Sequence, residues 1–119
     1  WVSGSPYDLA LARGAIASRD FEALAAVSEA SCLRMHAVAM AAQPGLVYWN
    51  GTTVECLHRV RALCEEGAPV FFTIDAGPQL KAICDPAVSE LVAATLAGVP
   101  GVIEIVRCGL GDGARVVED

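Results

Sequence analysis

The sequence lacks the features of a membrane or secreted protein. No apolar run reaches the roughly 18 residues that a membrane-spanning helix needs. The first residues, 1–6, hold neither the basic region nor the apolar stretch of a signal peptide. We therefore expect a cytoplasmic protein that has no membrane as a partner.

Basic residues are also scarce. Lys and Arg total 8 against 14 Asp and Glu, which gives a net charge of −6. The basic residues are spread along the chain and form no cluster that could follow a phosphate backbone. Nucleic acid is therefore not expected as a partner.

The cysteines form no recognisable metal or redox motif. Their number, 5, is odd, no C-x-x-C pair occurs, and they lie in apolar segments, where cysteine behaves as a small hydrophobic residue. No set of His, Cys, Asp or Glu has the spacing of metal ligands either. We expect free thiols in a reducing compartment, and no metal site.

Apolar residues, by contrast, are abundant. The chain is 55% hydrophobic and only 18% charged, which is rich for a free-standing domain. A length of 119 residues suffices for one domain with a single core. We therefore expect residues 1–119 to be one domain that covers an apolar face with another domain or subunit.

The spacing of apolar residues predicts two helices at the start of the chain. The first covers residues 7–18. The second begins with Asp20 as its N-cap and runs for about six turns until Pro44. Residues 46–49, which follow, are too few to show a period and form either a connection or a short strand.

Two further helices are predicted from their ends. Residues 52–55 read as a capping box in which a threonine oxygen and Glu55 satisfy free amides, so a third helix follows. Gly67 ends that helix in a left-handed conformation. Asp85, followed by proline, begins a fourth helix that ends near Gly98.

Three strands complete the pattern. Residues 69–74 are β-branched and aromatic without polar alternation, which is typical of a strand buried on both faces. Residues 80–84 and 102–107 are the second and third strands. The tail, 108–119, is rich in glycine and charge and is expected to be loosely held, apart from a possible edge strand at 115–117.

This order of elements predicts an α+β domain of the ferredoxin-like, split βαβ type. Its sheet would be antiparallel, with helices packed on one face and with the first strand upstream of residue 1. Because this fold is common, it says little about chemistry.

The sharpest local feature is the run DAGP at residues 75–78, at the end of the first predicted strand. Gly77 lets a ligand approach the backbone closely, and proline fixes the turn. A carboxylate held there is expected to be partly desolvated, which raises its basicity. The alternative is an ordinary turn in which Asp75 bonds to its own backbone.

Together with LRMHA at 33–37 and LVYW at 46–49, this run resembles the carboxyl-terminal part of diphosphomevalonate decarboxylases of the GHMP kinase superfamily. The resemblance covers nearly the whole chain. It implies that Asp75 is the catalytic acid or base beside the tertiary hydroxyl of the substrate, and that Ala76 and Gly77 line the substrate site. The family usually has Asn after the proline, whereas this chain has Gln79.

The resemblance also implies a reaction. The family phosphorylates the 3-hydroxyl of mevalonate diphosphate with ATP and then releases phosphate and carbon dioxide, which leaves isopentenyl diphosphate. ATP and Mg²⁺ would be bound mainly by an amino-terminal domain outside this chain, so the chain alone is expected to be inactive. A homodimer is the common assembly that the resemblance implies.

The remaining candidates have structural alternatives. Arg34 and His36 could face the substrate, or they could serve helix packing and capping. His58 is expected on a solvated face, and the glycine-rich run at 109–113 precedes no helix and so is no phosphate loop. Two other functions stay open: a related superfamily enzyme (a phosphomevalonate decarboxylase or a small-molecule kinase), and a noncatalytic ferredoxin-like ligand-binding module.

Overall fold

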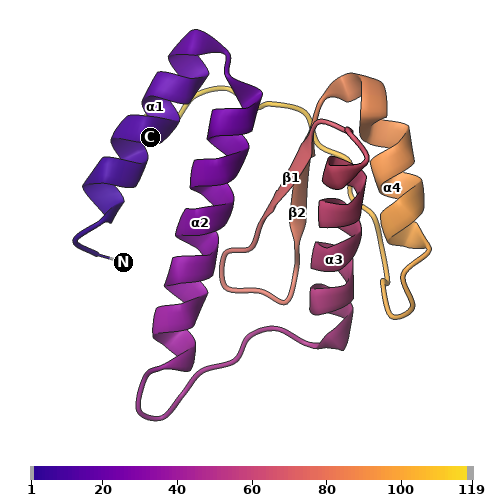
Figure 1. Cartoon of the computed structure of the whole chain (residues 1–119), viewed down its shortest axis with the longest axis horizontal. Coiled ribbons are helices and arrows are strands. Elements are labelled where there is room, and N and C mark those ends of the chain that lie inside the picture. The colour runs from indigo at the N-terminus through magenta and orange to yellow at the C-terminus, as the bar shows by residue number, and fades with distance from the viewer. Residues whose placement is uncertain (1, 118–119) are drawn as a thin grey trace.

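A computed structural model describes residues 2–117 of the chain. Its elements, in order, are α1 (Ser5–Ser18), α2 (Phe21–Met40), α3 (Gly51–Glu65), β1 (Val70–Thr73), β2 (Lys81–Cys84), a 3-10 turn (Pro86–Val88) and α4 (Ser89–Ala97). In Figure 1, α1 and α2 form a helical hairpin on one side, α3 and α4 lie on the other, and the β1–β2 hairpin lies between them.

The helix ends follow from local capping. Asp20 accepts a hydrogen bond from the Ala23 amide at 2.9 Å, as predicted for the start of α2. Gly67, which follows α3, has φ = +95° and confirms the predicted left-handed stop. Asp85 caps the 3-10 turn that leads into α4 through the amide of Ala87, at 2.8 Å.

The predicted capping box of α3 was placed two residues too late. Asn50 is the N-cap, because its side-chain oxygen accepts from the Thr53 amide at 2.9 Å while the Thr53 hydroxyl accepts from the Asn50 amide at 3.3 Å. Glu55 instead pairs with Arg59 one turn later, at 2.8 Å. Asn and Thr are both good caps, so the sequence alone did not decide between them.

The sheet consists of β1 and β2, which pair antiparallel with Val70 opposite Cys84 and Thr73 opposite Lys81. Residues 102–107, predicted as a third strand, form no strand in the structure, and neither do residues 115–117 or 46–49. A strand is stable only when a neighbour satisfies its backbone groups. None of the segments described within residues 2–117 lies beside these runs as a partner.

The core lies between β1 and the helices α3 and α4. It includes Val60, Val70 and Phe72, all with exposures of 1% or less. Burial of a side chain such as Phe72 contributes about 1.5–3 kcal/mol of stability. On the opposite face of β1, Phe71 packs against Phe21 of α2 with ring centroids 5.3 Å apart. The expected α+β architecture is confirmed, and α2 adds a flank along β1.

Among residues 2–117, no helix is both long enough and apolar enough to span a bilayer.

Candidate functional site

Asp75 lies just beyond the end of β1, where the chain turns toward β2. Its carboxylate forms an ion pair with the Lys81 ammonium group, and 77% of the Asp75 side chain is exposed. The expectation of a partly desolvated carboxylate is therefore wrong for this chain. Strand β1 ends at Thr73, so Asp75 stands past the rim of the core rather than inside it.

The turn after Asp75 requires a glycine. Gly77 has φ = +90°, a region that side chains with a Cβ rarely adopt. A Cβ there would lie 3.4 Å from both the Cβ and the carbonyl oxygen of Tyr48 and 3.4 Å from the Ile74 side chain. Tyr48 thus lies directly against the turn. Ala76 and Gln79 are both exposed.

The far end of the turn is anchored to the start of α3. The Thr53 hydroxyl donates to the carbonyl oxygen of Pro78 at 2.9 Å, and Thr53 is only 3% exposed. The same residue belongs to the capping box of α3, so one threonine ties a helix start to the Asp75 turn.

The near end of the turn is anchored to α2. The Ile74 amide donates to the Cys32 sulfur at 3.2 Å, and His36 Nε2 lies 3.0 Å from the Ile74 carbonyl oxygen. Burial raises the pKa of the Cys32 thiol above its usual range, against smaller opposing effects of its hydrogen bonds. The thiol is therefore neutral at physiological pH.

His36 is buried, with 2% of its surface exposed, and it contacts backbone rather than an open cleft. Helix packing, the alternative to substrate binding given above, accounts for the position of His36 within the chain. Arg34 is exposed and pairs with Asp8 of α1 at 2.5 Å, so it serves the α1–α2 contact. His58 is exposed, as predicted.

A groove of about 560 Å³ opens between α1, α2 and β1 and reaches Asp75. Its walls are mainly apolar, and its polar groups include the hydroxyls of Ser28 and Ser31 and the carboxylates of Asp8 and Asp75. The groove thus gives a small molecule access to the Asp75 turn. Lys81, which completes the charged pair there, was missed by sequence reasoning, although the short hairpin could have indicated it.

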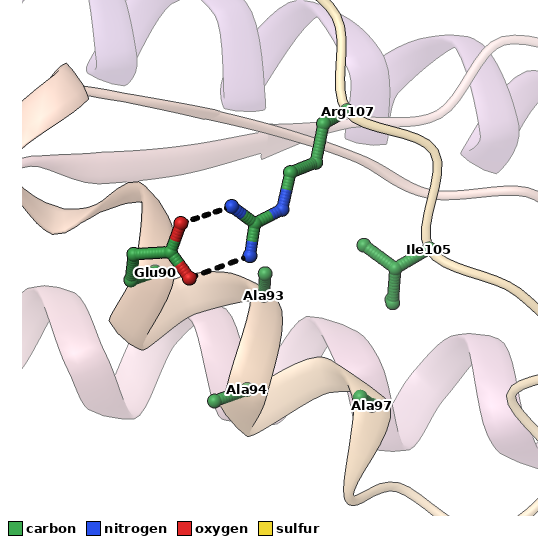
Figure 2. Close-up of a pocket in the computed structure, with 6 residues that line it drawn as sticks. All are labelled: Glu90, Ala93, Ala94, Ala97, Ile105 and Arg107. Carbon is green, nitrogen blue, oxygen red and sulfur yellow. Dashed lines mark hydrogen bonds and ion pairs between the residues drawn. The ribbon is translucent and has the colours of Figure 1, made fainter.

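A second groove, of about 480 Å³, lies between α4 and the segment that follows it. Figure 2 shows Arg107 reaching from this segment to the carboxylate of Glu90 with two hydrogen bonds, over a floor of alanines. Arg107 lowers the pKa of Glu90, first by hydrogen bonding and then by its charge. This groove contains no nucleophile or general base beyond that pair.

The described residues show neither a metal-ligand cluster nor a phosphate loop. Groups of three or more metal-ligating side chains are absent from these residues. The glycines at 109–113 lie in a segment without helix or strand, and no helix follows them up to residue 117, so they lack the helix terminus that phosphate loops use.

The chain matches known proteins over most of its length. A sequence model of the mevalonate 5-diphosphate decarboxylase C-terminal domain matches residues 6–101. A search of curated proteins found no match.

Solved structures agree with the family match. The chain is similar to mevalonate diphosphate decarboxylase from Enterococcus faecalis (32% identity, TM-score 0.77, covering 82% of this chain and 30% of that one). It is equally similar to the Staphylococcus aureus enzyme (32% identity, TM-score 0.77, covering 82% of this chain and 29% of that one). A structure of MDDEF in complex with MVAPP, AMPPCP and magnesium gives 30% identity, a TM-score of 0.78 and coverage of 85% and 31%.

This chain therefore spans about a third of the length of those proteins. The agreement of sequence and fold over four fifths of the chain is too extensive for a shared common fold alone. The chain belongs to the mevalonate 5-diphosphate decarboxylase C-terminal domain family.

Proposed function

We propose that this chain is the carboxyl-terminal domain of an enzyme that decarboxylates mevalonate 5-diphosphate with ATP and forms isopentenyl diphosphate. The observation that carries the proposal is the anchored Asp75 turn at the mouth of the α1–α2–β1 groove. The family membership and the similarity to a protein seen with MVAPP and AMPPCP, an ATP analogue, support it.

Asp75 is the proposed catalytic base. Its exposed carboxylate stands free of the core and is available to accept the proton of the substrate's 3-hydroxyl as that oxygen becomes the nucleophile. Ala76 and Gly77 present backbone without bulk, so a substrate can lie close to the turn. The partner Lys81 holds the carboxylate in place until substrate arrives.

ATP and Mg²⁺ are proposed to bind outside this chain, on an amino-terminal domain. The absence of metal-ligand groups and phosphate loops within residues 2–117 supports that division. The exposed apolar side chains of α1, which include Leu9, Leu11 and Ile16, offer a face for a neighbouring domain or a second subunit. A homodimer and a cytoplasmic location complete the proposal, and five free thiols are consistent with a reducing compartment.

The test is Asp75→Asn in the complete enzyme that carries this chain, with release of phosphate and carbon dioxide as readouts. We expect turnover to fall by about 10²- to 10⁴-fold, since a positioned base contributes that much. The Michaelis constant for mevalonate diphosphate should change little. Asp112→Asn, an exposed acid in the tail, is the matched control and should retain full activity.

A turnover of Asp75→Asn within about threefold of the parent would reject the catalytic assignment. Comparison of mevalonate phosphate with mevalonate diphosphate as substrate then separates the diphosphate decarboxylase from a phosphomevalonate decarboxylase. Phosphorylation without release of carbon dioxide would indicate a small-molecule kinase, and no turnover of any of these substrates would favour the noncatalytic ligand-binding module.

A further inference from the structure

Strand β1 has one edge that pairs with β2 and another that faces α2. The outward-facing amides are satisfied by side chains of α2 rather than by another strand. The Phe72 amide donates to the Glu29 carboxylate at 3.3 Å, and the Ile74 amide donates to the Cys32 sulfur at 3.2 Å. Glu29, Cys32 and His36, which we call the α2 polar stripe, are spaced so that they share one face of the helix.

The stripe binds both backbone polar groups of Ile74, its amide and its carbonyl oxygen. The Cys32 thiol also lies within hydrogen-bond reach of the Ile74 carbonyl oxygen, at 3.4 Å, and His36 Nε2 reaches the same oxygen at 3.0 Å. A carbonyl oxygen only accepts hydrogen bonds, so Nε2 carries the proton in this contact. Residue 74 lies beyond the last pair of the β1–β2 ladder, so no backbone of β2 competes for these groups.

Cys32 and His36 with their contacts to Ile74, which we call the clamp, are buried. Cys32, His36 and Ile74 are each at most 6% exposed. The ring of Trp49 lies 4.7 Å from that of His36, and the ring of Tyr48 lies 6.5 Å away, so the imidazole is held between α2 and the segment that contains these two rings.

Asp75 follows Ile74 directly, so whatever fixes the Ile74 peptide fixes the point from which the Asp75 side chain starts. We propose that Cys32 and His36 are positioning residues for Asp75, acting through the Ile74 peptide. The inference rests on the proposed function, because it gives the clamp a role only if Asp75 is catalytic. The stripe contains its own control, since Glu29 binds the same strand edge two residues farther from Asp75.

The test compares Cys32→Ala with Glu29→Ala in the complete enzyme. Each variant leaves one buried amide of the β1 edge without its partner, so both should lower the thermal midpoint. Only Cys32→Ala should lower turnover, by about 10- to 100-fold, because small displacements of a reacting group have effects of that size. The Michaelis constant should stay within about twofold.

Cys32→Ser supplies the rescue. A hydroxyl can accept from the Ile74 amide and donate to the Ile74 carbonyl, so this variant should recover most of the turnover. A thiol with a merely structural role would show the serine rescue in the thermal midpoint alone, with turnover unchanged in both Cys32 variants.

Four results would overturn the inference. Equal loss of turnover in Cys32→Ala and Glu29→Ala would show a general effect of destabilisation. Unchanged turnover in Cys32→Ala, with Asp75→Asn inactive, would reject the clamp and keep the proposed function, whereas an active Asp75→Asn would reject both. If Cys32→Ala does not fold, amide exchange on the parent decides: the Ile74 amide should exchange as slowly as those of β1, and fast exchange there rejects the clamp.

Discussion

Replacement of Gly77 by alanine should separate stability from activity, because the chain contains a matched glycine elsewhere. Gly77 and Gly67 have nearly the same positive φ, +90° and +95°. Alanine at either position pays for a left-handed backbone, a penalty of about 1–2 kcal/mol. The two sites differ in their surroundings, because nothing lies within 4 Å of a Cβ at Gly67, whereas a Cβ at Gly77 meets Tyr48 and Ile74 at 3.4 Å.

Contacts at that distance are tight but not overlapping, so the two variants should lose similar stability. We expect their thermal midpoints to fall by roughly 3–10 °C, from the usual relation between stability and melting temperature. Their activities should diverge. Gly67→Ala should keep normal turnover, while Gly77→Ala should lose at least about tenfold, because relief of its strain moves the turn that carries Asp75.

The assay is thermal unfolding and steady-state kinetics on both variants of the complete enzyme. Parent-like turnover in Gly77→Ala would refute the reasoning, since the turn would then tolerate displacement. An equal loss of turnover in Gly67→Ala would refute it too, because Gly67 precedes β1 and the Asp75 turn follows it, so the two sites lie at opposite ends of that strand.

Two further outcomes follow from the anchors of the turn. Thr53→Val removes the hydroxyl bonded to Pro78 and one half of the α3 capping box, and should cost about 1–2 kcal/mol in urea unfolding. Thr52→Val, which loses only an exposed contact at 3.3 Å, should cost much less, and equal costs would contradict the anchor. Stability should also fall at alkaline pH. The pKa of the Cys32 thiol is raised on folding by burial, so its contribution is complete below the unfolded pKa of about 8.5 and is lost as pH rises through the folded value. Cys32→Ser should weaken this alkaline loss of stability. An unchanged dependence of stability on pH in this variant would contradict the assignment to the Cys32 thiol.

Local signals explain what could be predicted from the sequence. Asp20 and Gly67 mark helix ends because a cap and a left-handed stop depend on neighbouring residues alone. The apolar, β-branched run of β1 likewise predicts a buried strand. The family could be recognised because the DAGP turn and its flanking motifs lie within continuous segments.

Predictions failed where the structure of a segment depends on a partner that is distant in the sequence. Residues 102–107 have a strand-like composition, but a strand forms only beside a neighbour, and within residues 2–117 they have none. The exposure of Asp75 depends on where β1 ends relative to the rim of the core. No local sequence pattern predicts that position.

The sequence by itself thus determined the helices, the buried strand, the candidate acid and the family. The tertiary structure alone decided what surrounds that acid: Lys81 is brought to Asp75 by the register of the hairpin, and Cys32 and His36 reach the Ile74 peptide from 42 and 38 residues away. The physical reason is that periodicity and capping act over a few residues. The partners of a buried peptide group are instead chosen by the packing of whole elements, which must satisfy every amide and carbonyl that they remove from water.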